Sequence, residues 1–161
     1  DLAAIGIGET LHAINRGENF LIVFMNNAVY GMTSGQMAPT TLAGMRTTTS
    51  PDGRDASYYG APIKIAELIA QLPGSFYVTR QAVNSANAVR RAKKALLNAF
   101  KYQQLHKGTC LVEIIGNCPS NWKMTPLEAS KFIDEEMVKT FPLGDIKIPD
   151  ANEIKKLMEE K

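Results

Sequence analysis

The sequence predicts an α/β fold of three layers, in which a parallel sheet lies between helices on both of its faces. Helical patterns alternate with short apolar segments along the chain, as in proteins with a covered parallel sheet. The most apolar segment, 20–25, is too short for a globular helix and too apolar for a half-exposed strand, so we expect a central strand buried on both faces. With 161 residues, 45% of them hydrophobic, the chain can bury a sizeable core.

The first half of the chain is predicted to hold a helix, a strand, a long loop and a short helix. Residues 2–16 carry apolar positions at helical spacing and run into a glycine, which is a helix stop. The strand is predicted over 20–26. Residues 27–61 lack a clear period. Loops of that length inside a compact domain are usually functional or disordered, and the Met, Tyr and Thr residues of this one favour an ordered loop. The short helix, over 62–72, begins with a proline, which is favoured in a first helical turn.

The second half is predicted to continue the alternation. We expect a strand over 76–79, a helix over 86–106, a strand over 109–115, a helix from 125 to about 141 and a short polar helix over 150–160. Asn84-Ser85 can cap the long helix, and Thr125-Pro-Leu-Glu128 has the form of a capping box. Prolines and a glycine make 142–149 an extended tail. We therefore divide the chain into a domain over 1–145 and a tail with a short helix over 146–161.

Charge and hydropathy argue against two classes of partner. The 18 basic and 16 acidic residues leave a net charge of +2, which is too balanced for a nucleic-acid-binding protein. No apolar run approaches the roughly 20 residues of a membrane span, and no signal peptide is apparent, so we expect a cytoplasmic protein. Cys110 and Cys118 are too few to hold an iron–sulfur cluster or a structural zinc alone, and a cytoplasmic disulfide between them is not expected.

Two amides stand where the first strand is predicted to end. Asn26 and Asn27 follow the apolar run directly, and ligands of open α/β sheets bind beyond the carboxyl ends of the strands. Mg²⁺ takes oxygen ligands and few of them from protein, so the Asn27 amide oxygen and the Val29 carbonyl oxygen could supply two. The segment 31–35 could bind phosphate through backbone N–H groups, although it lacks the lysine of a Walker loop. The alternative is that Asn26-Asn27 only forms a turn.

Other candidate residues also have structural explanations. His12 and His106 lie on or near predicted helices and are expected to be structural or solvated rather than catalytic. Cys118 and Trp122 follow the carboxyl end of a strand and either border the site or pack its loop. The basic residues of 86–106 form either a solvated outer face or a docking surface for an acidic redox partner.

Longer motifs carry a resemblance to a known family. They are 1–6, 24–41 (Phe-Met-Asn-Asn-Ala-Val-Tyr-Gly-Met-Thr-Ser-Gly-Gln-Met-Ala-Pro-Thr-Thr), 47–54, 77–80 and 118–122. Over about 1–145 the chain resembles the β subunit of 2-oxoacid:ferredoxin oxidoreductases, of the 2-oxoisovalerate or 2-oxoglutarate type. These thiamine diphosphate enzymes oxidatively decarboxylate a 2-oxoacid to an acyl-CoA and CO₂, and they reduce ferredoxin through iron–sulfur clusters. The resemblance implies the thiamine diphosphate-binding fold, in its diphosphate-binding domain.

The resemblance also implies roles for residues at the end of the first strand. The Asn27 side chain and the Val29 carbonyl would hold Mg²⁺. Four residues of the following turn would lie against the diphosphate and the thiazolium: Tyr30, Gly31, Met32 and Thr33. Met32 is the candidate for a contact with the side of the thiazolium ring, near the reacting carbon. No catalytic residue is assigned to this chain.

Other parts of such an enzyme are expected outside this chain. Gly-Asp-Gly, the first half of the thiamine motif with its metal-binding aspartate, is expected before Leu2, and Asp1 resembles the residue that follows it. We therefore expect an N-terminally truncated subunit, inactive alone, whose 4Fe-4S ligands lie elsewhere. The glutamate that activates the aminopyrimidine is expected in a pyrimidine-domain (α) subunit. Ferredoxin-type subunits, ferredoxin, the 2-oxoacid and CoA are the further expected partners.

The choice of 2-oxoacid stays open between branched-chain acids and 2-oxoglutarate, with Arg46, Arg54 and Arg80 as candidates for binding a substrate carboxylate. Two other functions also stay open. One is a non-catalytic α/β scaffold or interaction domain. The other is a different thiamine diphosphate decarboxylase or synthase, although the loop 30–36 differs from that of acetolactate synthase-like enzymes.

Overall fold

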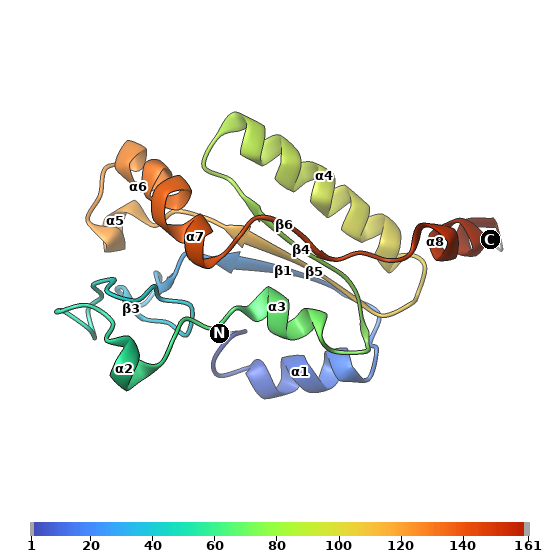
Figure 1. Ribbon diagram of the computed structural model, residues 1–161, viewed down its shortest axis with the longest axis horizontal. Coiled ribbons are helices and arrows are strands. Elements are labelled where there is room, and N and C mark those ends of the chain that lie inside the picture. The colour runs from blue at the N-terminus through green and yellow to red at the C-terminus, as the bar shows by residue number, and fades with distance from the viewer. Residues whose placement is uncertain (1, 160–161) are drawn as a thin grey trace.

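The computed structural model describes residues 2–159, and a four-stranded sheet lies at its centre (Figure 1). The strands are β1 (Leu21–Asn26), β4 (Ser75–Ala82), β5 (Thr109–Ile115) and β6 (Gly144–Lys147), in the order β1-β5-β4-β6. β1, β5 and β4 are parallel to one another, whereas β6 runs antiparallel to β4. The predicted α/β class with a mainly parallel sheet is confirmed.

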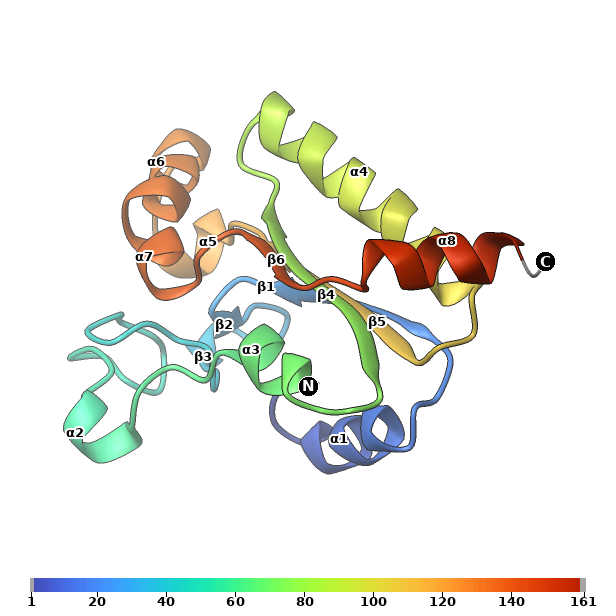
Figure 2. The same cartoon turned by 45° about the vertical axis from the view of Figure 1, so that its right-hand side comes forward.

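Helices cover both faces of this sheet, as predicted. α4 (Ala86–Gln103) lies along one face, and α1 (Ile7–Asn15) and α3 (Ile65–Ala70) lie on the other (Figure 1, Figure 2). The buried residues of α4 are all small: Ala88, Ala92, Ala95 and Ala99. Because they recur every three or four residues, they form one stripe that lets the helix approach the sheet closely.

Shorter elements complete the described chain. They are the strands β2 (Val29–Tyr30) and β3 (Gln36–Met37), the helices α2 (Ala56–Tyr59), α5 (Pro119–Trp122), α6 (Pro126–Phe132), α7 (Val138–Thr140) and α8 (Ala151–Glu159), and the π-helical turn η1 (Ile133–Met137). The helix predicted from 125 to 141 is thus interrupted by a π turn. The last predicted helix is present up to 159, and residue 160, like Asp1, lies outside the described residues.

The prediction that 20–25 forms a central strand buried on both faces is wrong. Within the described residues β1 is an edge strand that pairs with β5, and Val23 and Met25 are 47% and 59% exposed. The central strand is β5, in which every residue is buried. An apolar run predicts that both faces of a strand are buried. It does not predict which elements cover those faces or which strands lie on either side.

The segment predicted as an extended tail over 142–149 contributes strand β6. The Tyr77 hydroxyl donates to Asp145 Oδ1 at 2.8 Å, and Thr79 Oγ1 donates to the Gly144 carbonyl at 3.1 Å. These side-chain hydrogen bonds reinforce the pairing between β4 and β6. The division of the chain at residue 145 stays a prediction, and β6 extends across it.

The apolar core ties the loop after β1 to the rest of the fold. One cluster lies between α4 and the sheet, and a second lies between the sheet and the helices α1 and α3. A third cluster joins Ala28 and Val29, which follow β1, to Trp122 and Phe141. The backbone at the carboxyl end of β1 is therefore part of a packed core. Of the helices within 2–159, none combines the length and hydropathy that a membrane crossing needs.

A capping box begins α6, as predicted. Thr125 Oγ1 accepts a hydrogen bond from the Glu128 N–H at 3.3 Å, and Glu128 Oε2 accepts one from the Thr125 N–H at 2.8 Å. Hydrogen bonds from the backbone and the hydroxyl of Thr125 lower the pKa of Glu128. Because the folded-state pKa is the lower one, this stabilisation is present above the ordinary carboxyl pKa and is lost as the pH falls through the folded-state value.

We therefore expect Glu128→Gln to lower the free energy of unfolding at pH 7 and to have a smaller effect at an acidic pH low enough to protonate the Glu128 carboxylate. Urea unfolding at the two pH values measures both effects. Glu135→Gln, which removes a carboxylate in η1, is the control and should follow the unmodified protein. An equal loss for Glu128→Gln at both pH values would contradict the capping role.

Candidate functional site

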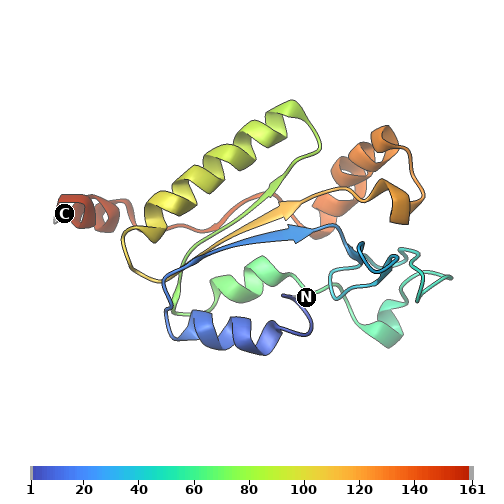
Figure 3. The ribbon, with the colours of Figure 1, turned by 180° about the vertical axis from the view of Figure 1, so that it is seen from behind.

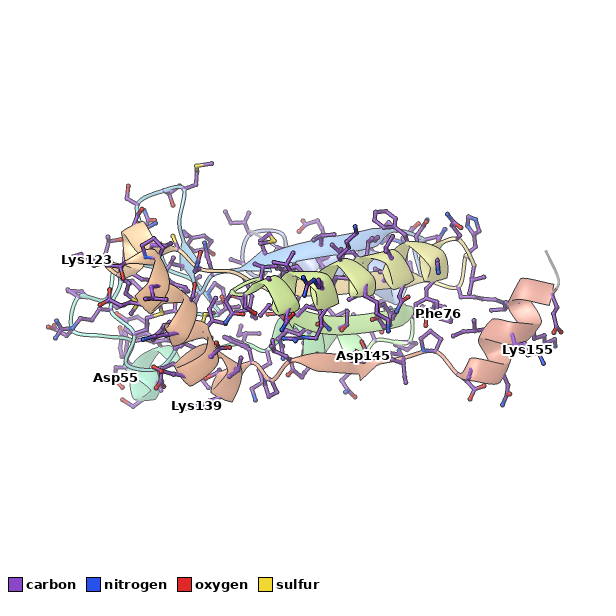
Figure 4. All side chains as sticks on the ribbon, turned by 90° about the horizontal axis from the view of Figure 1, so that it is seen from above. Asp55, Phe76, Lys123, Lys139, Asp145 and Lys155 are labelled. Atoms are coloured by element: carbon purple, nitrogen blue, oxygen red, sulfur yellow. The ribbon has the colours of Figure 1, made fainter. Side chains whose placement is uncertain are left out.

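The candidate site lies at the end of the sheet that is formed by the carboxyl ends of β1 and β5. Figure 3 shows these two strands pointing the same way, toward the loop 27–61 and toward α5. Figure 4 shows Lys123 and Asp55 at this end of the molecule, whereas Phe76, near the start of β4, lies toward the other end. Ligands of parallel sheets bind beyond the carboxyl ends of the strands, because the loops that follow the strands meet there.

The turn after β1 supplies the predicted metal ligands. Asn26 Oδ1 accepts a hydrogen bond from the Ala28 N–H at 3.0 Å, and Asn27 Oδ1 accepts one from the Val29 N–H at 3.3 Å. Ala28 has a φ of +59°, a left-handed conformation that costs a residue with a Cβ about 1 kcal/mol. The asparagines thus form a turn, as the purely structural interpretation of Asn26-Asn27 predicts. The two predicted ligand groups, the Asn27 amide and the Val29 carbonyl, both belong to this turn.

Two distant side chains hold the peptide groups of this turn. Trp122 Nε1 donates to the Asn27 carbonyl at 3.1 Å. Thr41 Oγ1 donates to the Ala28 carbonyl and accepts from the Ala38 N–H at 2.8 Å. The sequence does not indicate the role of Thr41, and it allows two interpretations of Trp122. The available signal was the Trp122 indole N–H, which needs an acceptor when it is buried.

The following residues form a short hairpin of β2 and β3. The Gly35 N–H donates to the Tyr30 carbonyl at 2.9 Å, and Asn121 Nδ2 donates to the Gly31 carbonyl at 3.0 Å. A Cβ at Gly31 would lie 3.2 Å from both Asn27 Nδ2 and Cys118 Sγ. The backbone of Gly31 is therefore packed tightly against the first metal-ligand candidate, and a larger residue would press on it.

The structure places the predicted cofactor-binding residues in two groups. Asn27, Val29, Tyr30 and Gly31 lie together at the strand end, half-buried or buried. Met32 is fully exposed at the tip of the hairpin, and Thr33, also exposed, donates to the Gln36 side chain at 2.7 Å. Met32 and Thr33 therefore face outward, where they can contact a ligand or a neighbouring subunit but not the core.

A small cavity of about 60 Å³ opens beside the turn. It is lined by Ala3, Phe24, Met25, Asn26, Asn27, Val29, Tyr30, Ala38, Pro39 and Thr40. The cavity has room for water but is too small for a whole organic cofactor. A larger ligand would lie over this edge of the sheet.

The donor set fits a hard cation only in part. Among residues 2–159, His, Cys, Asp and Glu form no group of three or more that could hold a metal. The Asn27 amide oxygen and the Val29 carbonyl oxygen are hard donors, and Mg²⁺ commonly takes only one or two protein ligands beside phosphate oxygens and water. The turn therefore fits Mg²⁺ as a phosphate-bridging ion, and it does not fit a self-contained metal site.

Two of the three candidate arginines are engaged inside the protein. Arg54 is 5% exposed, and burial lowers its pKa. Its guanidinium donates to carbonyls of the long loop: Ala38, Pro39, Thr41, Tyr59, Gly60 and Ala61. Arg80 is completely buried in ion pairs. Neither is placed to bind a substrate carboxylate, whereas Arg46 is exposed at a cavity of about 450 Å³ that Lys123 also lines.

A buried ionic network lies behind the site, between α3 and the sheet. Arg80 pairs with Glu113 at 2.8 Å and with Glu67 on α3. Burial alone would lower the pKa of Arg80, but the hydrogen bonds and charges of Glu67 and Glu113 raise it overall. The charged state of the guanidinium is thus secured. This network was not predicted from the sequence, where its one trace is Glu113, a charged residue inside an otherwise uncharged strand.

The chain is similar to parts of longer proteins. It is 43% identical over 147 residues to the ketoisovalerate oxidoreductase subunit VorA of Methanothermobacter thermautotrophicus, a match that covers 91% of this chain and 31% of that subunit. It is 35% identical over 163 residues to the 2-oxoglutarate synthase subunit KorB of Archaeoglobus fulgidus, covering 99% of this chain and 57% of that subunit. The chain thus spans less than two thirds of the length of these relatives.

A solved structure has the same fold. It is a 2-oxoglutarate:ferredoxin oxidoreductase from Magnetococcus marinus with 2-oxoglutarate, coenzyme A and succinyl-CoA bound. The match has a TM-score of 0.67 at 21% sequence identity, and it covers 98% of this chain and 58% of that one. The arrangement of strands and helices described above therefore occurs in a known enzyme.

A family profile also matches most of the chain. Residues 1–114 match the family described as "Thiamine pyrophosphate enzyme, C-terminal TPP binding domain". The matched range includes β1, the turn at Asn27 and the loop that Arg54 holds. The chain therefore belongs to the thiamine pyrophosphate enzyme family, through the C-terminal TPP-binding domain.

Proposed function

We propose that this chain is the diphosphate-binding part of a 2-oxoacid:ferredoxin oxidoreductase β subunit. The observation that carries the proposal is the Asn27–Val29 turn, which core packing and distant side chains hold at the carboxyl end of β1. The named relatives are subunits of ketoisovalerate and 2-oxoglutarate enzymes, which supports this class over a scaffold or another thiamine diphosphate enzyme.

Each residue of the turn has a proposed role. Asn27 Oδ1 and the Val29 carbonyl would hold Mg²⁺, which would offset the negative charge of the diphosphate. Tyr30, Gly31 and Thr33 would contact the diphosphate and the thiazolium, and the exposed Met32 would contact the side of the thiazolium ring. When bound, thiamine diphosphate supplies a nucleophilic carbon and an electron sink for decarboxylation. This chain contributes binding and orientation to that chemistry.

The complete enzyme is proposed to need further subunits. A pyrimidine-domain subunit supplies the glutamate that activates the cofactor, and ferredoxin-type subunits and 4Fe-4S clusters pass electrons to ferredoxin, while CoA takes the acyl group. Relatives that are named as subunits support an assembly of this kind. We also propose a cytoplasmic location, because 2-oxoacids, CoA and ferredoxin are all water-soluble.

We propose a branched-chain 2-oxoacid as the substrate. The identity of 43% to a ketoisovalerate oxidoreductase subunit exceeds the 35% to a 2-oxoglutarate synthase subunit, which favours 2-oxoisovalerate over 2-oxoglutarate. Arg46 is the remaining candidate on this chain for a contact to a carboxylate, because Arg54 and Arg80 are engaged elsewhere.

The test uses the complete subunit assembled with its partner subunits. Reduction of a low-potential dye is followed with CoA, thiamine diphosphate and Mg²⁺, using pyruvate, 2-oxoglutarate and 2-oxoisovalerate in turn. We expect the fastest reduction with 2-oxoisovalerate. Asn27→Ala should slow it by at least about tenfold, since losing even an outer-shell partner of a metal costs about 10–100-fold.

Asn87→Ala, an exposed asparagine on α4, is the matched control and should behave like the unmodified enzyme. No reduction with any acid, from a complex shown to hold its clusters and cofactor, would contradict the oxidoreductase assignment. Full activity in Asn27→Ala would contradict the role of the turn.

A further inference from the structure

Glu113 is a charged residue in the centre of the most buried strand. Every residue of β5 is buried, and Glu113 itself is 0% exposed. Its neighbours on the same face of the sheet include Leu111. Well-packed apolar residues in place of a whole buried ionic network, here Glu113, Arg80 and Glu67, are often as stable as the network or more so. Stability of the fold therefore does not by itself explain why a charged network that includes Glu113 lies there.

Both oxygens of Glu113 accept hydrogen bonds. Oε1 accepts from Asn26 Nδ2 at 2.7 Å, and Oε2 accepts from Arg80 Nε at 2.8 Å. Arg80 is held in turn by Glu67 on α3, to which Nη1 donates at 2.9 Å, and by the Pro142 carbonyl at 3.0 Å. The carboxylate thus connects a rigid guanidinium on β4 with an amide at the end of β1.

The Asn26 amide, which Glu113 binds, stabilises the turn after β1. With Nδ2 bonded to Glu113, Asn26 presents Oδ1 to the Ala28 N–H at 3.0 Å. Ala28 has the left-handed φ of +59°, so its backbone needs such a contact to stay in place. The flanking residues Asn27 and Val29 carry the proposed ligand atoms.

We infer that Glu113 is a positioning residue for the metal-binding turn: through Asn26 it fixes the backbone from which Asn27 Oδ1 and the Val29 carbonyl reach Mg²⁺. The inference rests on the proposed function in one respect, namely that the turn binds Mg²⁺ with thiamine diphosphate. Glu113 touches neither ion nor cofactor and acts only through Asn26.

The hydrogen-bond pattern requires a carboxylate at 113. Both neighbours, Asn26 Nδ2 and Arg80 Nε, are donors, and a carboxylate is the side chain that accepts from both. A glutamine would present one oxygen and one N–H group. With its oxygen toward Arg80, its N–H group would face Asn26, which could accept only by turning its own oxygen away from Ala28.

The same pattern predicts a rescue. In the double variant Asn26→Asp/Glu113→Gln, the glutamine oxygen accepts from Arg80 Nε and its N–H group donates to the new aspartate. The second aspartate oxygen then accepts from the Ala28 N–H, as Asn26 Oδ1 does now. The carboxylate and the amide have exchanged places, and the net charge of the network is unchanged.

The test measures Mg²⁺ binding to the complete enzyme, freed of metal and saturated with thiamine diphosphate, by calorimetry, with thermal unfolding recorded in parallel. We expect Glu113→Gln to raise the Kd for Mg²⁺ by about 10–100-fold, as for other second-layer partners of a metal. The double variant should return to within about threefold of the unmodified enzyme. Asn26→Ala, which removes the acceptor for Ala28 directly, should weaken Mg²⁺ binding as Glu113→Gln does.

Tyr77→Phe is the control for a loss of stability alone. Tyr77 lies on β4, away from the turn, and this change removes its hydrogen bond to Asp145 on β6. It should therefore lower the melting temperature and leave the Kd for Mg²⁺ unchanged. An unmodified Kd in Glu113→Gln, or in Asn26→Ala where Glu113→Gln fails to fold, would overturn the inference, as would a double variant no better than Glu113→Gln. If Asn27→Ala does not alter Mg²⁺ binding, the proposed function fails, and the inference fails with it.

Discussion

Replacing Arg54 by methionine is expected to lower the free energy of unfolding by about 3–5 kcal/mol, because each buried carbonyl that loses its hydrogen-bond donor costs about 1–3 kcal/mol. The guanidinium is the centre of the loop 38–61, where it donates to carbonyls on both of its arms, including Thr41 at 3.0 Å and Gly60 at 3.1 Å. Methionine fills much of the space but donates nothing, so the buried carbonyls of Ala38 and Thr41 lose their partner, whereas the carbonyl of the exposed Gly60 can bind water instead.

The effect should extend from the loop to the site. Arg54 binds the carbonyl of Thr41, whose hydroxyl donates to the Ala28 carbonyl in the turn that we propose binds Mg²⁺. Urea unfolding measures the stability, and hydrogen exchange of 38–61 measures the loosening of the loop. Arg46→Met, an exposed arginine of the same loop, is the control and should change the free energy of unfolding by less than about 0.5 kcal/mol. Equal effects of the two variants would refute the organising role of Arg54.

Gly74→Ala should destabilise the fold by about 3 kcal/mol or more, because the new Cβ would collide with backbone atoms. Gly74 lies just before β4, at the end of the sheet opposite to the candidate site. A Cβ at Gly74 would lie 1.8 Å from the Ile14 carbonyl oxygen and 2.7 Å from the Gly17 nitrogen. Both are backbone atoms that cannot rotate away, so the corner after α1 must shift, and overpacking of this kind costs about 1–3 kcal/mol or more. Calorimetric or urea unfolding measures the loss.

Gly8→Ala is the matched control for this prediction. Gly8 lies in α1, where a Cβ would meet nothing within 4 Å. Because alanine is a better helix former than glycine, this change should stabilise the protein by about 0.5–1 kcal/mol. Opposite signs for the two substitutions are the expected result, and a tolerated Gly74→Ala would show that the corner is looser than described.

The layers of the fold could be predicted from the sequence because their signals are local. α4 has alanines at helical spacing and a serine cap whose hydroxyl accepts from the Ala88 N–H, and β5 is a short apolar run. The position of β1 at the edge could not be predicted, because pairing depends on which strands are neighbours in space. β6 was missed for the same reason: it is short and half-exposed, and its pairing partner lies more than 60 residues earlier in the chain.

The candidate site divides in the same way. The turn at Asn26-Asn27 follows from an abrupt change of polarity at the end of a strand, so its place was predictable. The groups that hold it come from far along the chain: Trp122 is 95 residues away from Asn27, and Glu113 is 87 residues away from Asn26. Such contacts leave only indirect traces in the sequence, such as a charged residue inside an apolar strand.

The position of the metal tests the central claim most directly. Crystals of the complete enzyme grown with thiamine diphosphate and Mn²⁺ in place of Mg²⁺ would give an anomalous difference peak at the ion. We expect the peak at about 2–2.3 Å from Asn27 Oδ1 and from the Val29 carbonyl oxygen, with the diphosphate as a further ligand. A bound cofactor whose metal peak lies away from this turn would contradict the account.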